Sequence, residues 1–134
     1  MELAKPGTGG GVHALFLDPS ARHALAVLRD ASGRPGETLY AHASFRKARP
    51  VPRLRGCAPT AVAWHAGPGG ANDAATREVL CGSATGTLYE LAIEVADKKE
   101  RVFRPLLDLR EREPVCGLHM EARARIMLRR LSWR

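Results

Sequence analysis

Residues 86–93 read Gly-Thr-Leu-Tyr-Glu-Leu-Ala-Ile, and part of this stretch occurs a second time in the chain. Forty-nine residues earlier, residues 36–42 read Gly-Glu-Thr-Leu-Tyr-Ala-His, so one Thr-Leu-Tyr motif matches the other. Both copies combine β-branched, aromatic and apolar residues, which is typical of a strand. The sequence therefore predicts a repeated unit that contains this strand.

Apolar runs precede the first copy of the motif. Residues 12–17 are apolar at nearly every position, as a strand buried on both faces is, and residues 25–28 form a second such run. Residues 37–42 supply a third strand. Residues 44–54 contain Pro50 and a second proline, so a strand there belongs at a sheet edge, where a missing N–H costs no ladder bond. Three strands and an edge strand make the first unit.

A second unit follows in the same order. Residues 60–65 align with residues 11–16 under the same shift of 49. Residues 78–82 and 87–93 read as the next two strands, and the Ser-Ala-Thr-Gly sequence between them favours a tight hairpin turn. We therefore expect the second unit to repeat the first strand by strand.

An outer strand and the start of a third unit come next. Residues 103–109 begin Phe-Arg-Pro, and this Arg-Pro pair follows the third strand just as Arg49-Pro50 does in the first unit. Residues 115–120 then resemble the opening strand again, 54 residues after Ala61. The proline thus recurs at the predicted edge.

Units of about fifty residues, with four strands and a proline-bearing outer strand, are typical of β-propeller blades. A β-sandwich is the alternative, but a repeat that keeps its register over several strands favours the propeller. We expect an all-β, incomplete β-propeller over residues 12–120, with about two four-stranded blades and the opening strand of a third. Residues 1–11 are expected to be a flexible Gly-rich leader.

Residues 121–134 depart from the blade pattern. They carry five arginines against one glutamate, a net charge of +4 within the +7 of the whole chain. Helix-forming residues with apolar Ile126, Leu128 and Leu131 allow a short basic amphipathic helix. The alternative is a truncated or misjoined end of the reading frame. A basic tail of this kind also raises the hypothesis of an adaptor that binds RNA or anionic membrane.

The composition points to a globular protein. The 134 residues suit one small domain, and 45% hydrophobic with 26% charged residues argues against disorder. Of the 21 basic residues only four are lysines, a bias that a GC-rich coding sequence produces, and residues 1–120 carry a net charge of only +3. Both observations argue against a nucleic-acid-binding body. Residues 1–11 lack a signal-peptide pattern, and no apolar run is long enough to cross a bilayer.

Three cysteines, Cys57, Cys81 and Cys116, are too far apart for a C-x-x-C pair, so neither a disulfide scaffold nor a zinc site is supported. Cys81 and Cys116 lie in apolar runs, where a cysteine behaves as a small buried hydrophobe. We expect a reducing compartment.

No set of residues predicts a catalytic or metal site. The histidines are expected at the surface or at strand ends; His13 and His23 flank a turn and are placed to approach each other across a hairpin, but no third ligand is spaced to join them. Cys116 and His119 are three apart on a predicted strand, hence on opposite faces. We expect no catalytic residue, no cofactor and no metal, and the sequence assigns no binding residue.

Five short motifs occur in a fixed order. They are Leu-Phe-Leu-Asp-Pro at 15–19, Arg-Pro-Val-Pro at 49–52, Ala-Val-Ala-Trp at 61–64, Gly-Ser-Ala-Thr-Gly-Thr-Leu-Tyr-Glu at 82–90 and Phe-Arg-Pro-Leu at 103–106. As an ordered series over about residues 12–120, they resemble the N-terminal region of the deep-orange family, which are vacuolar protein sorting-associated subunits of the class C endolysosomal tethering core.

The resemblance implies an N-terminal β-propeller, which an α-solenoid and a C-terminal zinc-binding RING-type domain follow in the family. It also implies work in the HOPS and CORVET complexes, which tether endosomes, lysosomes or vacuoles before SNARE-driven fusion. These 134 residues contain neither the solenoid nor the RING cysteines. What the resemblance implies for them is a non-enzymatic protein-interaction module. Its expected partners are the other class C subunits and, indirectly, the SNARE machinery, and its expected place is cytoplasmic and peripheral on late endosome, lysosome or vacuole membranes.

Overall fold

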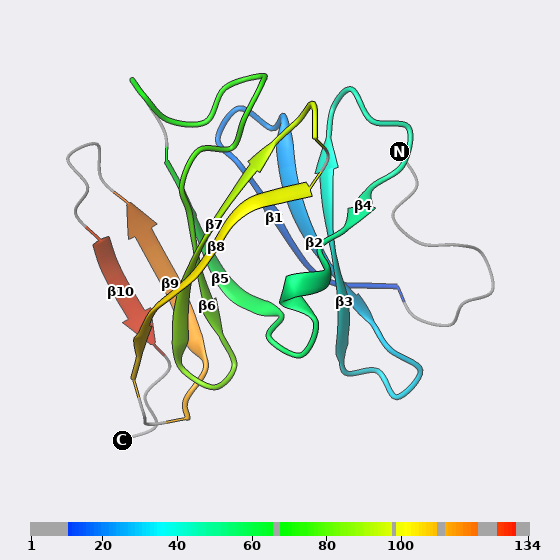
Figure 1. The fold of residues 1–134 in the computed structure, drawn as a ribbon. Helices are drawn as coiled ribbons and strands as arrows, with labels where there is room; N and C mark the ends of the chain where they lie inside the picture. Colours follow the sequence, from blue (N-terminus) through cyan, green and yellow to red (C-terminus); the bar gives the residue numbers. More distant parts are fainter. Residues whose placement is uncertain (1–10, 66–67, 98, 110–111, 121–125, 131–134) are drawn as a thin grey trace. The chain divides into compact units, whose positions relative to one another are not determined.

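The computed structural model describes residues 11–65, 68–97, 99–109, 112–120 and 126–130 (Figure 1). Ten strands and one 3-10 helix are the regular elements of these ranges, which confirms the all-β prediction. The chain divides into two compact units, unit 1 (Met1–Ala58) and unit 2 (Pro59–Arg134). The expected leader lies, except for Gly11, outside the described residues.

The elements in chain order are β1 (Val12–Leu17), β2 (His23–Arg29), β3 (Pro35–His42), β4 (Arg49–Pro50), η1 (Pro52–Leu54), β5 (Pro59–Trp64), β6 (Val79–Ser83), β7 (Thr87–Glu94), β8 (Lys99–Asp108), β9 (Val115–Met120) and β10 (Ile126–Arg130).

Unit 1 is a four-stranded antiparallel sheet in the order β1-β2-β3-β4, which is the strand order of a propeller blade. Its centre is apolar, because Leu25 and Val27 of β2 and Tyr40 of β3 are at most 1% exposed. β4 contains Pro50 and is the last strand of the sheet, so the proline lies at the edge as predicted. Leu54 of η1 is fully buried.

Two turns of unit 1 share a five-residue pattern, Asp-x-Ser-x-Arg, which begins at Asp18 and again at Asp30. The Asp18 carboxylate accepts hydrogen bonds from three backbone N–H groups and from the Ser20 hydroxyl, over 2.6–3.1 Å. The Asp30 carboxylate accepts from two backbone N–H groups and from the Ser32 hydroxyl, over 2.6–3.0 Å. A short carboxylate that bonds its own turn fixes where the chain reverses.

Unit 2 holds a second four-stranded antiparallel sheet, β5-β6-β7-β8, and the antiparallel pair β9-β10. The strand β7, which carries the second Thr-Leu-Tyr motif, is third in its sheet as β3 is in unit 1. The β6–β7 hairpin turns at Gly86, whose φ of +84° favours glycine. The Ser83 hydroxyl accepts from the backbone N–H groups of Thr85 and Thr87 at 3.3 and 3.1 Å. The two sheets confirm the two predicted four-stranded units.

The strand β9 packs across the sheet of unit 2. Val115 of β9, Ala61 of β5 and Leu88 of β7 form a buried apolar cluster, with Leu109 and Leu118 packed against it. This is the position of an opening strand of a third unit, as predicted from residues 115–120.

A hydroxyl group links the same strands. The Thr60 hydroxyl of β5 lies 3.1 Å from the carbonyl oxygen of Gly82 in β6 and 2.5 Å from that of Val115 in β9. A hydroxyl has one proton to donate, so it bonds one carbonyl at a time and lies between the two. Thr60 thereby joins the four-stranded sheet to the strand that covers it.

The register of the repeat differs from the predicted uniform shift of 49. Residues 25 and 81 are equivalent, because each lies opposite the tyrosine of its Thr-Leu-Tyr motif. Residue 16 lies opposite residue 25 and residue 62 opposite residue 81, so the opening strands are related by 46 residues. A longer β5–β6 connection and a shorter β6–β7 hairpin then change the shift at each strand. The equivalent positions are Phe16 and Val62 at 46, Leu25 and Cys81 at 56, and Tyr40 and Tyr89 at 49. The predicted alignment of residues 60–65 with 11–16 is therefore wrong by three positions, because the two loops differ in length.

Of the two alternatives for the basic tail, the short helix is wrong for the part that the structure describes. Ile126–Arg130 is the strand β10, and it pairs with β9 from Ile126 opposite Met120 to Arg130 opposite Val115. Pairing with an open strand edge overrides a local preference for helix, since tertiary contacts outweigh propensity. Residues 121–125 and 131–134 lie outside the description.

Candidate interaction surface

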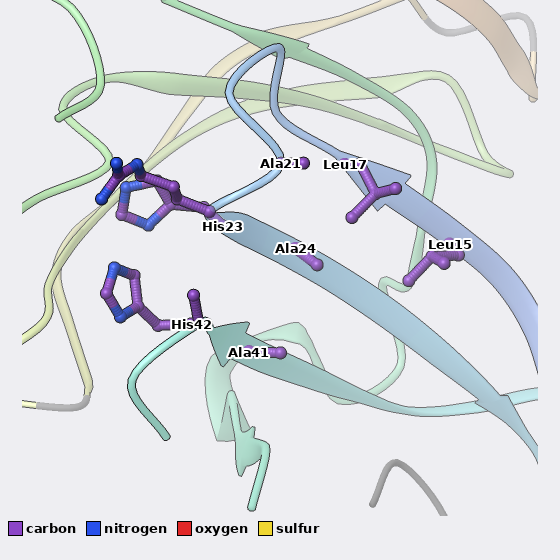
Figure 2. Close-up of a pocket in the computed structure, with 9 residues that line it drawn as sticks. Leu15, Leu17, Ala21, His23, Ala24, Ala41 and His42 are labelled. Atoms are coloured by element: carbon purple, nitrogen blue, oxygen red, sulfur yellow. The ribbon is translucent and has the colours of Figure 1, made fainter. Parts of the chain in front are cut away.

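An apolar hollow of about 170 Å³ lies on the sheet of unit 1 (Figure 2). Leu15 and Leu17 of β1, Ala24 of β2 and Ala41 of β3 line it, together with the turn that contains Ala21. Leu15 is 48% and Leu17 55% exposed, although neighbouring residues of the sheet are buried. The surface can take an apolar side chain from another molecule or segment.

The equivalent surface of unit 2 is covered. Strand pairing places Ala61 and Ala63 where Leu15 and Leu17 stand in unit 1, and both alanines are 4% exposed. Ala61 packs against Val115 of β9. The same sheet face is therefore closed by a strand in one unit and lined by half-exposed leucines in the other.

At one end of the hollow, the ends of β2 and β3 bring together two histidines that also line it. His23 and His42 are opposite residues of the pair β2-β3, their ring centroids lie 5.0 Å apart, and they are 1% and 3% exposed. His23 Nδ1 lies 2.7 Å from the Tyr40 hydroxyl, and the Phe45 ring packs edge-on against Tyr40 and His42. The result is a buried aromatic cluster.

This cluster corrects the prediction for the histidines. His13 was placed to approach His23 across the hairpin, but it lies toward the other end of β1, where Ala14 is opposite Val27. His23 and His42 do stand at strand ends, as predicted, but they are buried. The repeat could have indicated this burial, because His42 occupies the position of Leu91 in the second unit, and Leu91 is apolar.

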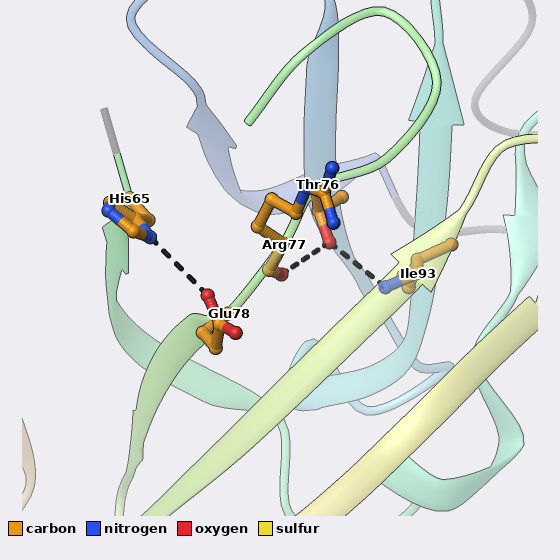
Figure 3. Close-up of polar contacts among 5 residues, drawn as sticks. All are labelled: His65, Thr76, Arg77, Glu78 and Ile93. Atoms are coloured by element: carbon orange, nitrogen blue, oxygen red, sulfur yellow. Dashed lines mark hydrogen bonds and ion pairs between the residues drawn. The ribbon is translucent and has the colours of Figure 1, made fainter. Parts of the chain in front are cut away.

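A polar network holds the long β5–β6 connection against β7 (Figure 3). The Thr76 hydroxyl donates to the carbonyl of Arg77 at 2.8 Å and accepts from the backbone N–H of Ile93 at 2.9 Å. His65 Nδ1 lies 3.3 Å from a Glu78 carboxylate oxygen. Hydrogen bonds from the Glu78 backbone N–H and from His65 hold the pKa of the Glu78 carboxyl below its usual value, and burial opposes them weakly. The contact joins the residue that follows β5 to the residue that precedes β6.

The outer strand β8 exposes a second apolar surface. Val102, Leu106 and Leu107 are 40–50% exposed. The Arg104 guanidinium bonds the Glu90 carboxylate of β7 across the strand pair. Pro105 lies within this strand and has no backbone N–H to donate.

The cysteines have different surroundings. Cys81 is fully buried, as predicted, but Cys116 is exposed, so its predicted burial is wrong. In the described structure β9 pairs with β10, and Cys116 and His119 are exposed residues of β9. Burial raises the pKa of the Cys57 thiol, which makes it a poorer nucleophile.

The described part of the chain contains no cluster of three or more metal-ligating side chains. Within the same ranges, no helix has the length and apolar character that crossing a bilayer requires.

Comparison with known proteins identifies the blades. Residues 1–131 match the family model described as the Pep3/Vps18/deep orange beta-propeller domain. The chain is 34% identical over 112 residues to the Arabidopsis thaliana protein named vacuolar sorting protein 18, and the alignment covers 83% of this chain and 11% of that protein. It is 28% identical over 132 residues to the Drosophila melanogaster protein named vacuolar protein sorting-associated protein 18 homolog, covering 90% and 13%, and 28% identical over 119 residues to the Danio rerio protein of the same name, covering 82% and 12%.

The match extends over almost the whole chain but over only 11–13% of these relatives. The two four-stranded sheets are thus blades of a propeller, and the resemblance seen in the ordered motifs is confirmed. The chain belongs to the Pep3/Vps18/deep orange family and forms part of its β-propeller domain.

Proposed function

We propose that this chain is a non-enzymatic protein-interaction module of a subunit of the HOPS and CORVET tethering complexes, which act when vesicles dock and fuse with endosomes, lysosomes or vacuoles. Its partners are the other class C subunits and, through them, the SNARE machinery. It works on the cytoplasmic side, as a peripheral component on late endosome, lysosome or vacuole membranes. The observation that carries the proposal is the family match over residues 1–131, together with relatives that are named for vacuolar sorting.

The geometry of the described residues supports a binding role. Apolar side chains are exposed on two separate surfaces, the hollow with Leu15 and Leu17 and the outer strand with Leu106 and Leu107. Exposed apolar side chains that lie together on a protein surface often form contacts with other proteins. The buried polar groups Asp18 and Thr76 are used in turns and loop anchoring.

Affinity capture tests the proposal. The intact protein that contains this chain is tagged and recovered from cells, and we expect the other class C tethering subunits to be recovered with it in comparable amounts. Recovery of none of these subunits from lysates in which they are abundant would refute the proposal.

Two matched double variants of the intact protein then locate the contact. L15K/L17K places two positive charges at the hollow, and L106K/L107K places two at the outer strand, in both cases at leucines that are 41–55% exposed. If only one of the two double variants loses a partner subunit, the contact with that subunit is assigned to the surface that this variant changes. Circular dichroism and thermal unfolding show that both variants keep their fold.

A second hypothesis rests on the net charge of +4 of residues 121–134, which suits RNA or anionic membrane. Deleting this segment would also remove β10 from its pairing with β9, so changing the charge alone is the sharper test. Replacing its five arginines by glutamine should abolish binding to RNA or to phosphatidylserine vesicles at low salt. Equal binding by the wild-type chain and this variant would refute the second hypothesis.

A further inference from the structure

The net charge of the chain is distributed unevenly between its parts. Residues 11–58 contain eight basic against three acidic residues, a net charge of +5, whereas residues 59–120 contain seven against nine, a net charge of −2. Two of the three carboxylates in the first range, those of Asp18 and Asp30, accept hydrogen bonds of their own turns. The blade of unit 1 is therefore basic, and a blade with one sign of charge attracts partners of the opposite sign.

Most of this positive charge comes from one short segment at the edge of the sheet. Residues 46–55 read Arg-Lys-Ala-Arg-Pro-Val-Pro-Arg-Leu-Arg and contain no acidic residue. The segment includes the last strand of the sheet, β4, and the helix η1 that follows it (Figure 1). We call residues 46–55 the basic edge. Its basic residues are all exposed, and they are Arg46, Lys47, Arg49, Arg53 and Arg55.

Two buried residues fix the backbone of the basic edge. Val51 is 3% exposed and Leu54 is fully buried. The backbone N–H of Val51 donates to the Thr38 carbonyl of β3 at 2.9 Å, and that of Leu54 donates to the Val51 carbonyl at 3.0 Å. The basic side chains therefore extend into solvent from a backbone that the sheet already holds. Such preorganisation lowers the entropy cost of binding a partner.

The side chains of the basic edge favour carboxylates on a peptide. Four of its five basic residues are arginines, and a planar guanidinium binds a carboxylate through two parallel hydrogen bonds. Insertion into a bilayer or stacking on bases requires exposed apolar or aromatic side chains. Val51 and Leu54 of residues 46–55 are buried, and the neighbouring Phe45 ring packs edge-on against Tyr40. Since β4 has only two residues and one is a proline, a partner binds through these side chains and does not extend the sheet.

We propose that the basic edge binds an acidic segment of a partner protein, whose aspartate and glutamate carboxylates pair with the guanidinium groups of Arg46, Arg49 and the arginines of η1 and its C-terminal end. The basic edge shares no residue with the apolar hollow or with the outer strand β8. The proposal therefore goes beyond the tethering function and does not depend on it. Salt screens attraction between exposed charges, so this binding weakens as the ionic strength rises.

Fluorescence anisotropy tests the proposal with a defined probe. A fluorescein-labelled decapeptide of glutamate is titrated with the intact protein that contains this chain, and a decapeptide of glutamine is the uncharged control. We expect saturable binding of the glutamate peptide at about 50 mM salt, at least about tenfold weaker binding at about 500 mM salt, and no binding of the glutamine peptide. Failure to bind the glutamate peptide at the lower salt concentration overturns the proposal and leaves the tethering function untouched.

Two matched variants assign the binding to the basic edge. R46Q/R49Q removes two arginines from it, and R77Q/R112Q removes two exposed arginines from unit 2. We expect R46Q/R49Q to weaken binding of the glutamate peptide by roughly three- to tenfold and R77Q/R112Q to change it by less than about twofold. Equal affinities of the two variants overturn the assignment, because net charge alone would then explain the binding.

Phosphatidylserine vesicles replace the peptide in a parallel titration. The proposal predicts that R46Q/R49Q changes binding of the glutamate peptide more than binding of the vesicles. A protein that binds the vesicles and not the peptide, and that R46Q/R49Q releases from them, would overturn the proposal and assign the basic edge to a membrane surface. Circular dichroism shows that both variants keep their fold.

Discussion

Val115 of β9 occupies the space that any side chain at Gly82 of β6 would need. A Cβ atom built at Gly82 collides with Cβ, Cγ1 and Cγ2 of Val115, and Val115 is fully buried. The absence of a side chain in the middle of β6 therefore allows the opening strand of the next blade to pack directly on the sheet. A glycine inside a strand costs stability by itself, so the close approach is what explains it.

Gly82→Ala should destabilise unit 2 by about 1–3 kcal/mol, because the added methyl group forces β9 away from the sheet. Chemical denaturation of the 134-residue chain measures the loss. Gly11→Ala is the matched control, because a Cβ at Gly11 meets no atom within 4 Å, and its effect should stay within about 0.5 kcal/mol. The double variant G82A/V115A should lose less stability than the sum of the losses of the two single variants. A loss equal to that sum would show that the two residues do not share the space.

Asp18→Ala should cost about 1–3 kcal/mol, because it leaves donors of a buried turn, among them the backbone N–H of His23, without their acceptor. Asp30→Ala removes a similar set of bonds from an exposed turn, where water replaces them, and should cost less than Asp18→Ala. Thermal unfolding of the two variants compares buried with exposed copies of one motif. Equal losses of stability in the two variants would contradict the prediction that burial of the turn raises the cost of removing its carboxylate.

The charge of Asp18 should also make stability depend on pH in the acid range. Burial raises the pKa of the Asp18 carboxyl, but hydrogen bonds from Ser20, His23 and Arg22 outweigh it and hold the pKa below the usual 3.8. The unfolded chain then binds the proton first, so the contribution of Asp18 is complete above about pH 5 and is lost as the pH falls toward 3. Asp18→Asn keeps an acceptor without the charge and should flatten the unfolding free energy between pH 5 and 3. An unchanged slope would contradict this.

Tyr40→Phe should cost about 1 kcal/mol, because it removes the hydroxyl that lies 2.7 Å from His23 Nδ1 and leaves a buried ring nitrogen without that partner. Tyr89→Phe, the same change at the equivalent position of unit 2, is the internal control. Tyr89 packs on the Phe103 ring. Urea denaturation measures both variants, and an unchanged stability of Tyr40→Phe would show that the Tyr40 hydroxyl does not stabilise the histidine cluster.

Much of the fold was predictable because blade strands carry local signals. The Thr-Leu-Tyr motif, the apolar runs and the edge prolines marked β1 to β9, and the hairpin at Gly86 followed from its turn residues. The alignment of the opening strands failed, since two loops of unequal length changed the shift between 46 and 56. A motif within a single strand does not indicate the lengths of the loops that connect this strand to its neighbours.

The sequence by itself determined the all-β class, the repeated four-stranded unit and the family, because these depend on residue patterns within single strands. Tertiary structure decided what lies between strands that are far apart in the chain. It placed Val115 against Gly82, brought His23 beside His42 and made a strand of residues 126–130 by pairing them with β9. Such contacts depend on register and on which faces meet, and a shift of one residue in register exchanges the faces of a strand.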